Sequence, residues 1–352
     1  MRLPNFGKRI EKKIYFKDRG PRRSNFAIFC DFVKGFVKNG ETDSCYWLYD
    51  FPHKSPDEQN EYLHYAEFRK DRNRINLKEF FSESGREHWN YLVVLRDKLI
   101  FWQFLKGMGF KTPECCYYYN FRDRSLTDIR NGQIIDPSEI LHESGDFFCK
   151  AIEGECGKGI YKLRIDNGNL FANGKQVEKL DKPNASSYLI QRNVIQHDDI
   201  NKIYSKSVNT IRAITIIDKH GVPQLLSAVM RFGAHGNLVD NWFQGGFVVG
   251  INDDGTLRDF GIYEFPINGE IIVNEHPDTH VKFGGISIPF YTDAVAEALR
   301  LHSFIPQIRA IGWDIAITPD GPTFIEGNDN FEISLHQTVD NGLKRKWKRL
   351  IQ

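Results

Sequence analysis

The sequence lacks the features of a membrane-spanning, disulfide-bonded or zinc-binding protein. It has no apolar run near the length needed to cross a bilayer, and no apolar segment before a cleavage site at its start. Its six cysteines form no C-x₂-C pair and match no zinc spacing. From these absences we expect a reduced, cytoplasmic setting.

A strong net charge is also absent. The formal net charge is +1, so bulk charge gives no reason to expect a nucleic-acid partner. Basic residues are nevertheless concentrated near both ends, within residues 1–23 and 344–349. They form either a solvated surface, with the later group complementing a helix dipole, or a peripheral contact with an anionic membrane that carries a lipid-linked substrate.

Internal repeats and low-complexity linkers are missing as well, and the composition is that of a folded protein. The 352 residues exceed what one hydrophobic core usually organises, so we expect two or three packed units. Aromatic residues make up 13% of the chain, which argues against disorder. Residues 1–90 carry no recognisable chemistry, but helical patterns at 27–37 and 58–72 predict a partly helical extension.

Beyond residue 90 the pattern predicts one helix and then mostly short strands. Apolar residues recur at helical spacing from Leu95 to Leu105. Strands mixed with a few later helices predict an α+β protein with largely antiparallel sheets. The expected strands are 115–119, 146–152, 159–165, 187–194, 210–217, 224–232, 313–318 and 323–326, and the expected later helices are 291–303 and 339–351.

The strongest functional signal is the segment 312–328, which we interpret as a β-hairpin. A three-residue turn at 319–321, of sequence Pro-Asp-Gly, ends on a position that needs positive φ, which glycine adopts readily. Counting outward places Asp314 opposite Glu326, and opposed residues lie about 4.5–5.5 Å apart at Cβ. Asn328 leaves its strand on the same face as Glu326, because side chains alternate along a strand.

Two carboxylates and an amide oxygen would therefore converge on one side of a rigid hairpin. Two like charges this close repel unless a cation lies between them. Oxygen ligands of this kind suit Mg²⁺, which keeps its other positions for water and phosphate oxygens. A surface hairpin with solvated acids is the alternative, but the apolar flanking residues favour a core position. We therefore predict that Asp314, Glu326 and Asn328 bind a metal.

A glycine-rich stretch gives a second, weaker signal. A predicted strand delivers Lys150, and glycines at 154, 157 and 159 follow, with Lys158 between the last two. Glycines let backbone N–H groups approach phosphate without a Cβ clash. This is not a Walker A loop, because no Ser or Thr follows the lysine and no helix follows the loop. A glycine-rich hairpin turn explains the same residues equally well.

Two arginines interrupt predicted apolar strands. Arg212 lies within 210–217, and Arg231 lies within 224–232. Each either forms a structural ion pair or clamps a phosphate or acyl phosphate, since a guanidinium matches phosphate bidentately. The polar pair at 240–241 and a Gly-Gly turn signal at 245–246 follow.

Together these residues resemble the ATP-grasp superfamily, and they look closest to its sugar-transfer-associated family. The resemblance runs from about Tyr91 to the C-terminus and is most specific in the 312–328 segment. It implies an ATP-grasp fold, in which two α+β subdomains clasp ATP. Residues 91–200 would form the N-terminal subdomain with the glycine-rich loop and hinge. Residues 201–352 would form the C-terminal subdomain with the metal-binding hairpin, and residues 1–90 a mainly helical extension.

The resemblance also assigns nucleotide contacts to individual residues. Lys98 and Lys150 would reach the nucleotide, with Lys150 on the α- and β-phosphates. The loop closing over the phosphates would contribute Gly154, Gly157, Lys158 and Gly159. The hinge strand would meet adenine through backbone groups of Gln191 and Val194, although Arg192-Asn193 stands where family members commonly carry an acid. Asp198 or Asp199 would bind the ribose hydroxyls.

Finally, the resemblance implies a reaction. Arg212, Arg231 and Lys150 would stabilise the transferring phosphoryl group or an acyl phosphate, with ATP and Mg²⁺ as cofactors. The expected enzyme is a ligase that joins a carboxylate and an amine, on a sugar or amino-acid component of a surface polysaccharide. The alternatives are a phosphotransferase acting on a sugar or polyol hydroxyl and a non-catalytic nucleotide-binding protein. The partner would be a small-molecule or glycan-precursor substrate.

Overall fold

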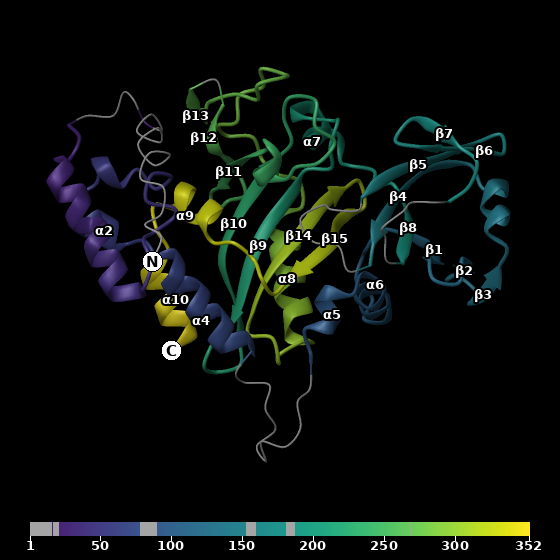
Figure 1. Cartoon of the computed structure of the whole chain (residues 1–352), viewed down its shortest axis with the longest axis horizontal. Helices are drawn as coiled ribbons and strands as arrows, with labels where there is room; N and C mark the ends of the chain where they lie inside the picture. Colours follow the sequence, from purple (N-terminus) through teal and green to yellow (C-terminus); the bar gives the residue numbers. More distant parts are fainter. Residues whose placement is uncertain (1–15, 17–20, 78–89, 153–159, 181–186, 268) are drawn as a thin grey trace, which may run out of the picture.

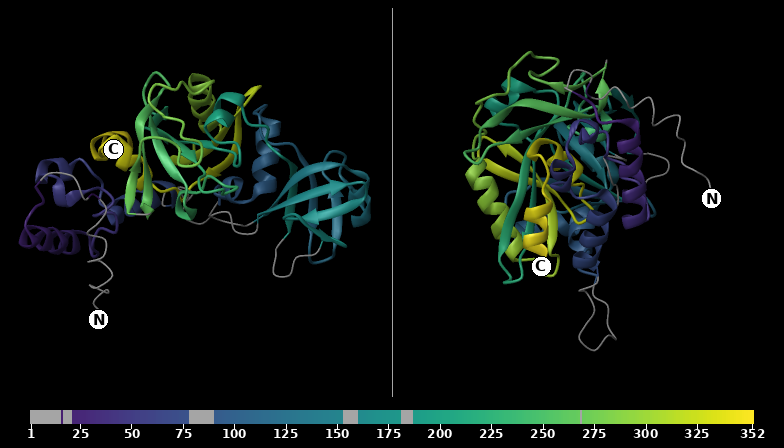
Figure 2. Two further views of the ribbon diagram at one scale, coloured as in Figure 1. Left: turned by 90° about the horizontal axis from the view of Figure 1, so that it is seen from above. Right: turned by 90° about the vertical axis from the view of Figure 1, so that its left-hand side faces the viewer.

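Two antiparallel sheets, one of eight strands and one of seven, form most of the computed structural model (Figure 1). It describes residues 16, 21–77, 90–152, 160–180, 187–267 and 269–352. The eight-stranded sheet lies at one end of the long axis, and the first helices lie at the other (Figure 2). None of the helices in these described residues has the length and apolar character that crossing a bilayer requires.

The eight-stranded sheet has a core of its own. Its strands follow the order β3-β2-β1-β8-β4-β5-β6-β7. Along β4, Phe147 and Cys149 point into this core, and Lys150 points to the opposite face because side chains alternate. The strands are β1 Cys115–Asn120, β2 Ser125–Asp128, β3 Gln133–Ile135, β4 Gly145–Ala151, β5 Tyr161–Asp166, β6 Asn169–Ala172, β7 Lys175–Val177 and β8 Tyr188–Arg192.

The seven-stranded sheet is more deeply buried. Its strands follow the order β13-β12-β11-β10-β9-β14-β15. The central strands are buried along nearly their whole length, as expected where both faces of a sheet are covered. The strands are β9 Thr210–Ile217, β10 Pro223–Phe232, β11 Phe247–Ile251, β12 Leu257–Ile267, β13 Glu270–Val273, β14 Ala310–Thr318 and β15 Gly321–Asn328.

Helices cover both faces of this second sheet. Helix α8 (Tyr291–Ser303) packs on one face, whereas α4 (Tyr65–Leu77) and α10 (Lys344–Ile351) pack on the other (Figure 1). The remaining helices are α2 Asn25–Asn39, α3 Pro56–Asn60, α5 Val93–Arg96, α6 Lys98–Gly107, α7 Asp198–Ile203 and α9 Ser334–Asp340, with short 3₁₀ turns at Phe51–His53, Pro137–His142 and Trp242–Gln244.

Strand β9 explains why one part of the sheet stays open. Thr210, Arg212, Ile214 and Ile216 alternate along the strand and therefore share a face. Ile214 and Ile216 belong to the core that Phe68 of α4 and Trp347 of α10 complete. Thr210 and Arg212 lie beyond those helices and line a cavity. The switch from polar to apolar residues along one strand thus positions the site.

Two of the predicted helices are each divided into two helices in the structure. The helix predicted over 339–351 is two helices, because Asn341 and Gly342 adopt left-handed φ values of 54° and 96°. A Cβ at Gly342 would also lie 2.4 Å from a backbone oxygen of Glu61. The helix predicted over 58–72 is likewise divided into α3 and α4. The predicted helix 291–303 and strand 210–217 are confirmed.

The N-terminal helices pack tightly against the C-terminal ones. The Gln337 side chain accepts a hydrogen bond from Leu63 N at 2.7 Å and donates to the Tyr49 hydroxyl at 2.8 Å. Phe68 and Trp347 meet edge to face with ring centroids 5.0 Å apart. Residues 21–77 are therefore an integral part of the body that carries the seven-stranded sheet.

Candidate active site

The β14–β15 hairpin brings Asp314 and Glu326 opposite each other, as predicted. The predicted three-residue turn is wrong: Thr318 pairs with Gly321, so the turn has two residues. The hydroxyl of Thr318 donates to the Gly321 carbonyl at 2.8 Å and closes this tighter turn. A bulge at Ile325 then adds one residue to β15 and restores the expected register.

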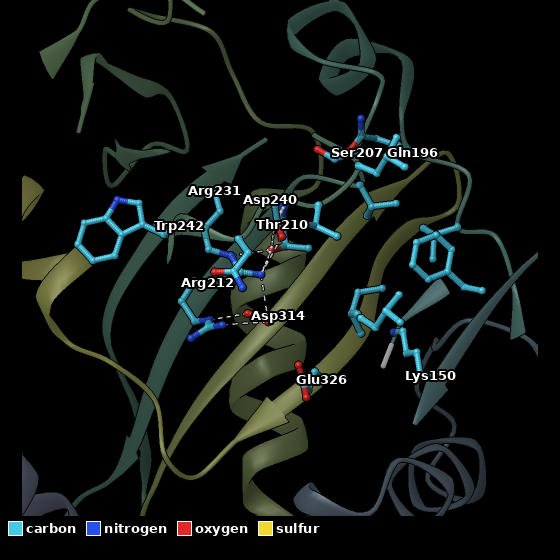
Figure 3. Close-up of a pocket in the computed structure, with 18 of the residues that line it drawn as sticks. Lys150, Gln196, Ser207, Thr210, Arg212, Arg231, Asp240, Trp242, Asp314 and Glu326 are labelled. Carbon is cyan, nitrogen blue, oxygen red and sulfur yellow. Dashed lines mark hydrogen bonds and ion pairs between the residues drawn. The ribbon is translucent and has the colours of Figure 1, made fainter. Parts of the chain in front are cut away.

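Asp314 lies in a buried cluster of charges rather than alone (Figure 3). Arg212 donates to both of its carboxylate oxygens, and Arg231 Nη2 lies 3.0 Å from its Oδ2. Arg231 also donates to Asp240 at 3.2 Å and to the Thr210 hydroxyl at 2.7 Å. Thr210 in turn donates to Asp240 at 2.5 Å. Two guanidinium groups and two carboxylates are therefore held in one network across β9, β10 and β14.

This network shifts the pKa values of its two acids in opposite directions. Burial alone would raise the pKa of Asp314, but the charges of Arg212 and Arg231 outweigh burial and lower it. Burial raises the pKa of Asp240, which Arg231 offsets only in part. Asp314 is thus the carboxylate that stays ionised over the wider pH range.

The opposite wall of the site carries two lysines. Lys150, from β4, is half-buried, and desolvation lowers its pKa although the charge of Glu326 acts in the opposite direction. Lys98, in the first turn of α6, has its Nζ 4.0 Å from Glu326 Oε1. Glu326 is therefore the acid of the hairpin that faces the two lysines, as Figure 3 shows for Lys150.

A cavity of about 530 Å³ lies between these walls. Both sheets contribute to its lining, and nine residues assigned from the sequence are among those that line it: Lys98, Lys150, Gln191, Val194, Arg212, Arg231, Asp314, Glu326 and Asn328. Asp198 and Asp199 are not among its lining residues, and Asp199 pairs with Lys202 at 2.6 Å on α7. The position of Asp199 thus gives the ribose assignment no support. Gly154, Gly157, Lys158 and Gly159 lie outside the described residues.

Sequence reasoning missed a buried polar network beside the hinge. Gln196 accepts a hydrogen bond from Asn209 N at 2.6 Å and donates to Tyr204 O at 2.9 Å. Gln196 and Ser207 line the cavity (Figure 3). The only sequence signal was a polar run just before an apolar strand, and Asp240 was noted merely as part of a polar pair.

The loop after the hairpin was missed as well. Asn330, Phe331 and Glu332 line the cavity. Arg72 of α4 donates to Phe331 O at 2.6 Å and also bonds Asn330, while the Tyr65 hydroxyl donates to Glu332 at 2.6 Å. The N-terminal helices therefore position one wall of the site.

The donor set on the hairpin fits Mg²⁺. Among the described residues no three His, Cys, Asp or Glu side chains are grouped to hold a metal ion, so any site here needs the amide oxygen of Asn328 as well. The Asn328 amide nitrogen is buried, and nothing in the described part of the chain accepts a hydrogen bond from it. The two carboxylates and the Asn328 amide oxygen form a hard-oxygen set, in which Asp314 would be shared with Arg212 and Arg231.

Comparison with known proteins identifies the family of this chain. Residues 86–351 match the family described as sugar-transfer associated ATP-grasp. The chain belongs to this family. The predicted ATP-grasp fold, with its mixed helices and antiparallel sheets, is thereby confirmed. No curated protein matches the sequence significantly.

Solved ATP-grasp structures are similar to this family member only at a distance. N5-carboxyaminoimidazole ribonucleotide synthetase from Thermus thermophilus is 13% identical, with a TM-score of 0.39 over 71% of this chain and 49% of its own. Biotin carboxylase from Campylobacter jejuni is 10% identical, with a TM-score of 0.43 over 74% and 47%. D-alanine–D-alanine ligase from Bacillus anthracis is 12% identical, with a TM-score of 0.37 over 73% and 65%. This ATP-grasp chain covers about half the length of the first two.

Proposed function

We propose that this ATP-grasp protein is an ATP- and Mg²⁺-dependent carboxylate–amine ligase acting on a sugar or amino-acid component of a surface polysaccharide. The observation that carries the proposal is the cavity in which Lys150, Arg212 and the Asp314–Glu326 pair face a common space. The sugar substrate class rests on the family description alone.

In this proposal the two walls of the cavity have different roles. Lys98 and Lys150 contact the phosphates of ATP, and backbone groups of Gln191 and Val194 contact adenine. Asp314, Glu326 and Asn328 would hold Mg²⁺, which would neutralise charge on the phosphate oxygens. Arg212 and Arg231 face the same cavity and match the planar oxygens of a carboxylate or phosphate.

The proposed reaction has two steps. A carboxylate oxygen of the substrate forms a bond to the γ-phosphorus as the bond to ADP breaks, and an acyl phosphate results. The amine nitrogen of the second substrate then attacks the carbonyl carbon, and inorganic phosphate leaves with formation of the amide. Arg212 and Arg231 stabilise the negative charge that develops on the transferring group, because their guanidinium groups are already fixed by Asp314 and Asp240.

Hydroxylamine trapping tests the acyl phosphate directly. The chain would be incubated with ATP, Mg²⁺ and a panel of sugar acids and amino acids, without an amine and with hydroxylamine. We expect ADP release and hydroxamate formation with the same acids. ADP release that depends on a sugar or polyol, without hydroxamate, would instead identify a phosphotransferase and overturn the ligase assignment.

Glu326→Gln tests the assignment of the hairpin. The variant should lower turnover by at least about 100-fold without changing the melting temperature, because the Glu326 side chain is 35% exposed. Glu297→Gln, on the exposed face of α8, is the matched control and should keep full activity. Unchanged ADP release by Glu326→Gln would show that the metal assignment is wrong.

A further inference from the structure

Helix α2 carries an apolar stripe that faces away from the body. Five of its side chains are exposed: Phe26, Phe29, Val33, Phe36 and Val37. At 100° per residue they fall within an arc of about 100°, so they form one continuous face rather than scattered single residues. Phe26 and Val37, near the two ends of the helix, are 75% and 79% exposed, so the stripe runs its whole length.

The opposite face of α2 is firmly anchored. Ile28 is buried, and Phe32 packs on Tyr46 with ring centroids 4.6 Å apart. Ser24 caps the first turn, and Gly40 ends the helix in a left-handed conformation with φ 79°. The orientation of the helix is therefore fixed by contacts, and these same contacts leave the stripe outside.

The exposed charged side chains of α2 have one sign. Lys34 and Lys38 are exposed and lie along one edge of it. The one acid of the helix, Asp31, faces inward, where it pairs with Arg23 and accepts from the Tyr46 hydroxyl at 2.6 Å. In the sequence that leads to α2, residues 1–23 hold nine Lys and Arg against two acids.

The basic group near the C-terminus differs from this one. Arg345 pairs with Glu61, and Lys348 lies 2.7 Å from both Glu67 and Asp71. These charges are compensated within the chain. Arg345 and Lys348 therefore differ from Lys34 and Lys38 of α2, which are exposed.

We propose that α2 is an interfacial helix that binds an anionic lipid bilayer, with its apolar stripe inserted and Lys34 and Lys38 at the headgroups. A helix with an apolar face, flanking lysines and no exposed acid has the pattern of helices that lie in the bilayer surface. Figure 2 shows α2, in purple, at the end of the molecule opposite the eight-stranded sheet, where a flat surface can reach it. The proposal does not depend on the proposed function.

A second copy of the chain is a poorer occupant of the stripe. An isologous pairing of two α2 helices would place the lysines of both copies beside the same short interface. Like charges at such an interface repel, and the helix has no exposed acid to compensate them. Anionic headgroups supply that compensation.

Vesicle flotation of the full chain tests the proposal. Wild type should float with vesicles of equal parts phosphatidylglycerol and phosphatidylcholine, and much less with phosphatidylcholine alone. The triple substitution Phe26→Ser, Phe29→Ser and Phe36→Ser should lower the partition coefficient by about 100-fold. Lys34→Gln with Lys38→Gln should lower it roughly tenfold on the anionic vesicles only.

A matched control removes three exposed apolar side chains elsewhere. Ile134→Ser, Val222→Ser and Phe265→Ser lie outside α2 and should leave the partition coefficient and the melting temperature unchanged. Failure of wild type to float, wild-type binding by the α2 variant, or an equal loss in the control would each overturn the proposal. So would a wild-type dimer that the α2 variant converts to a monomer, because a second copy would then cover the stripe.

Discussion

The two walls of the cavity hold their charges in different ways. On the seven-stranded sheet, Arg212 and Arg231 are bonded to Asp314 and Asp240, so that wall carries its own counter-charges. On the other wall, Lys150 is half-buried on β4, and the acid that raises its pKa most is Glu326 of the facing sheet. The arginines of the first wall are therefore balanced by acids of the same sheet, whereas the two lysines of the second wall face an acid of the other sheet.

This difference separates the requirements of folding from those of binding. Ion pairs in the buried cluster support the fold and the site at once, so their loss affects both. On the lysine wall, Glu326 only partly offsets the desolvation of Lys150, and a phosphate chain would offset it further. Substitutions on the two walls should accordingly give different combinations of lost activity and lost stability.

Asp314→Asn should lower activity and stability more than any other substitution considered, because it removes one of the two acids that pair with Arg212 and Arg231. We expect activity to fall by at least about 1000-fold and the free energy of unfolding to fall by about 3–5 kcal/mol, since two buried guanidinium groups lose a counter-charge. Chemical denaturation and ADP release measure the two effects. If Asp314→Asn and Glu326→Gln were equally stable, Asp314 would contribute no more to the fold than Glu326 does, contrary to this expectation.

Lys150→Met should weaken ATP binding by about 100-fold without lowering stability, because a half-buried, partly desolvated ammonium is replaced by an apolar side chain of similar length. Titration with ATP and thermal unfolding measure the two effects, and Lys175→Met on exposed β7 is the control. Because burial lowers the pKa of Lys150, ATP affinity should fall at a lower pH than the ordinary lysine value of 10.5 would give. If Lys150→Met were strongly destabilised, Lys150 would also be held in an ion pair that stabilises the fold.

Acid should affect the seven-stranded sheet first. Behind it, His302 bonds Thr215 at 2.6 Å, and burial lowers the pKa of His302 from 6.5 to about 4. The unfolded chain binds this proton below pH 6.5 and the native chain only near pH 4. The free energy of unfolding should therefore decrease as pH falls through that window, by up to about 3 kcal/mol.

Urea denaturation at pH 7 and pH 4.5 checks this expectation. His302→Gln should show a smaller difference between the two pH values than wild type does. The strands of the eight-stranded sheet contain no histidine, so its protection from hydrogen exchange should change less. Equal acid sensitivity of His302→Gln and wild type would refute the linkage.

Arg72→Ala should give the smallest effect, on one substrate only. Arg72 fixes Asn330 and Phe331, which line the cavity. We expect the KM of the acceptor substrate to rise about tenfold with the KM of ATP unchanged. Arg74→Ala, an exposed neighbour on α4, serves as the control. An equal rise in both KM values would assign Arg72 a structural role for the whole site.

Local patterns predicted the strands and the acid pair, but they did not predict how distant segments meet. Alternation along 210–217 gave β9 correctly, and counting from the turn gave the Asp314–Glu326 pairing even though the turn is shorter and a bulge compensates. The break at Asn341 was missed because helical periodicity continues across it.

Contacts between remote residues were beyond local reasoning. The Thr210–Asp240 bond joins β9 to the loop that follows β10, and the hydrogen bond from Arg72 to Phe331 links residues 259 positions apart. The sequence spacing of these residues does not predict their contacts, because the contacts depend on how distant segments pack and not on a periodic pattern. This is why the N-terminal helices had no role on sequence grounds and yet shape the cavity.

The contact between Leu63 and Gln337 has a consequence for how the protein is made. The two residues are 274 positions apart, so the early helices emerge from the ribosome long before their partners exist. Until then Phe68 and Leu63, both fully buried in the finished protein, have no core to enter. The core around Leu63 and Phe68 can therefore be completed only after the segment from Ile333 to Ile351 has been synthesised, and until then these apolar side chains remain exposed to aggregation.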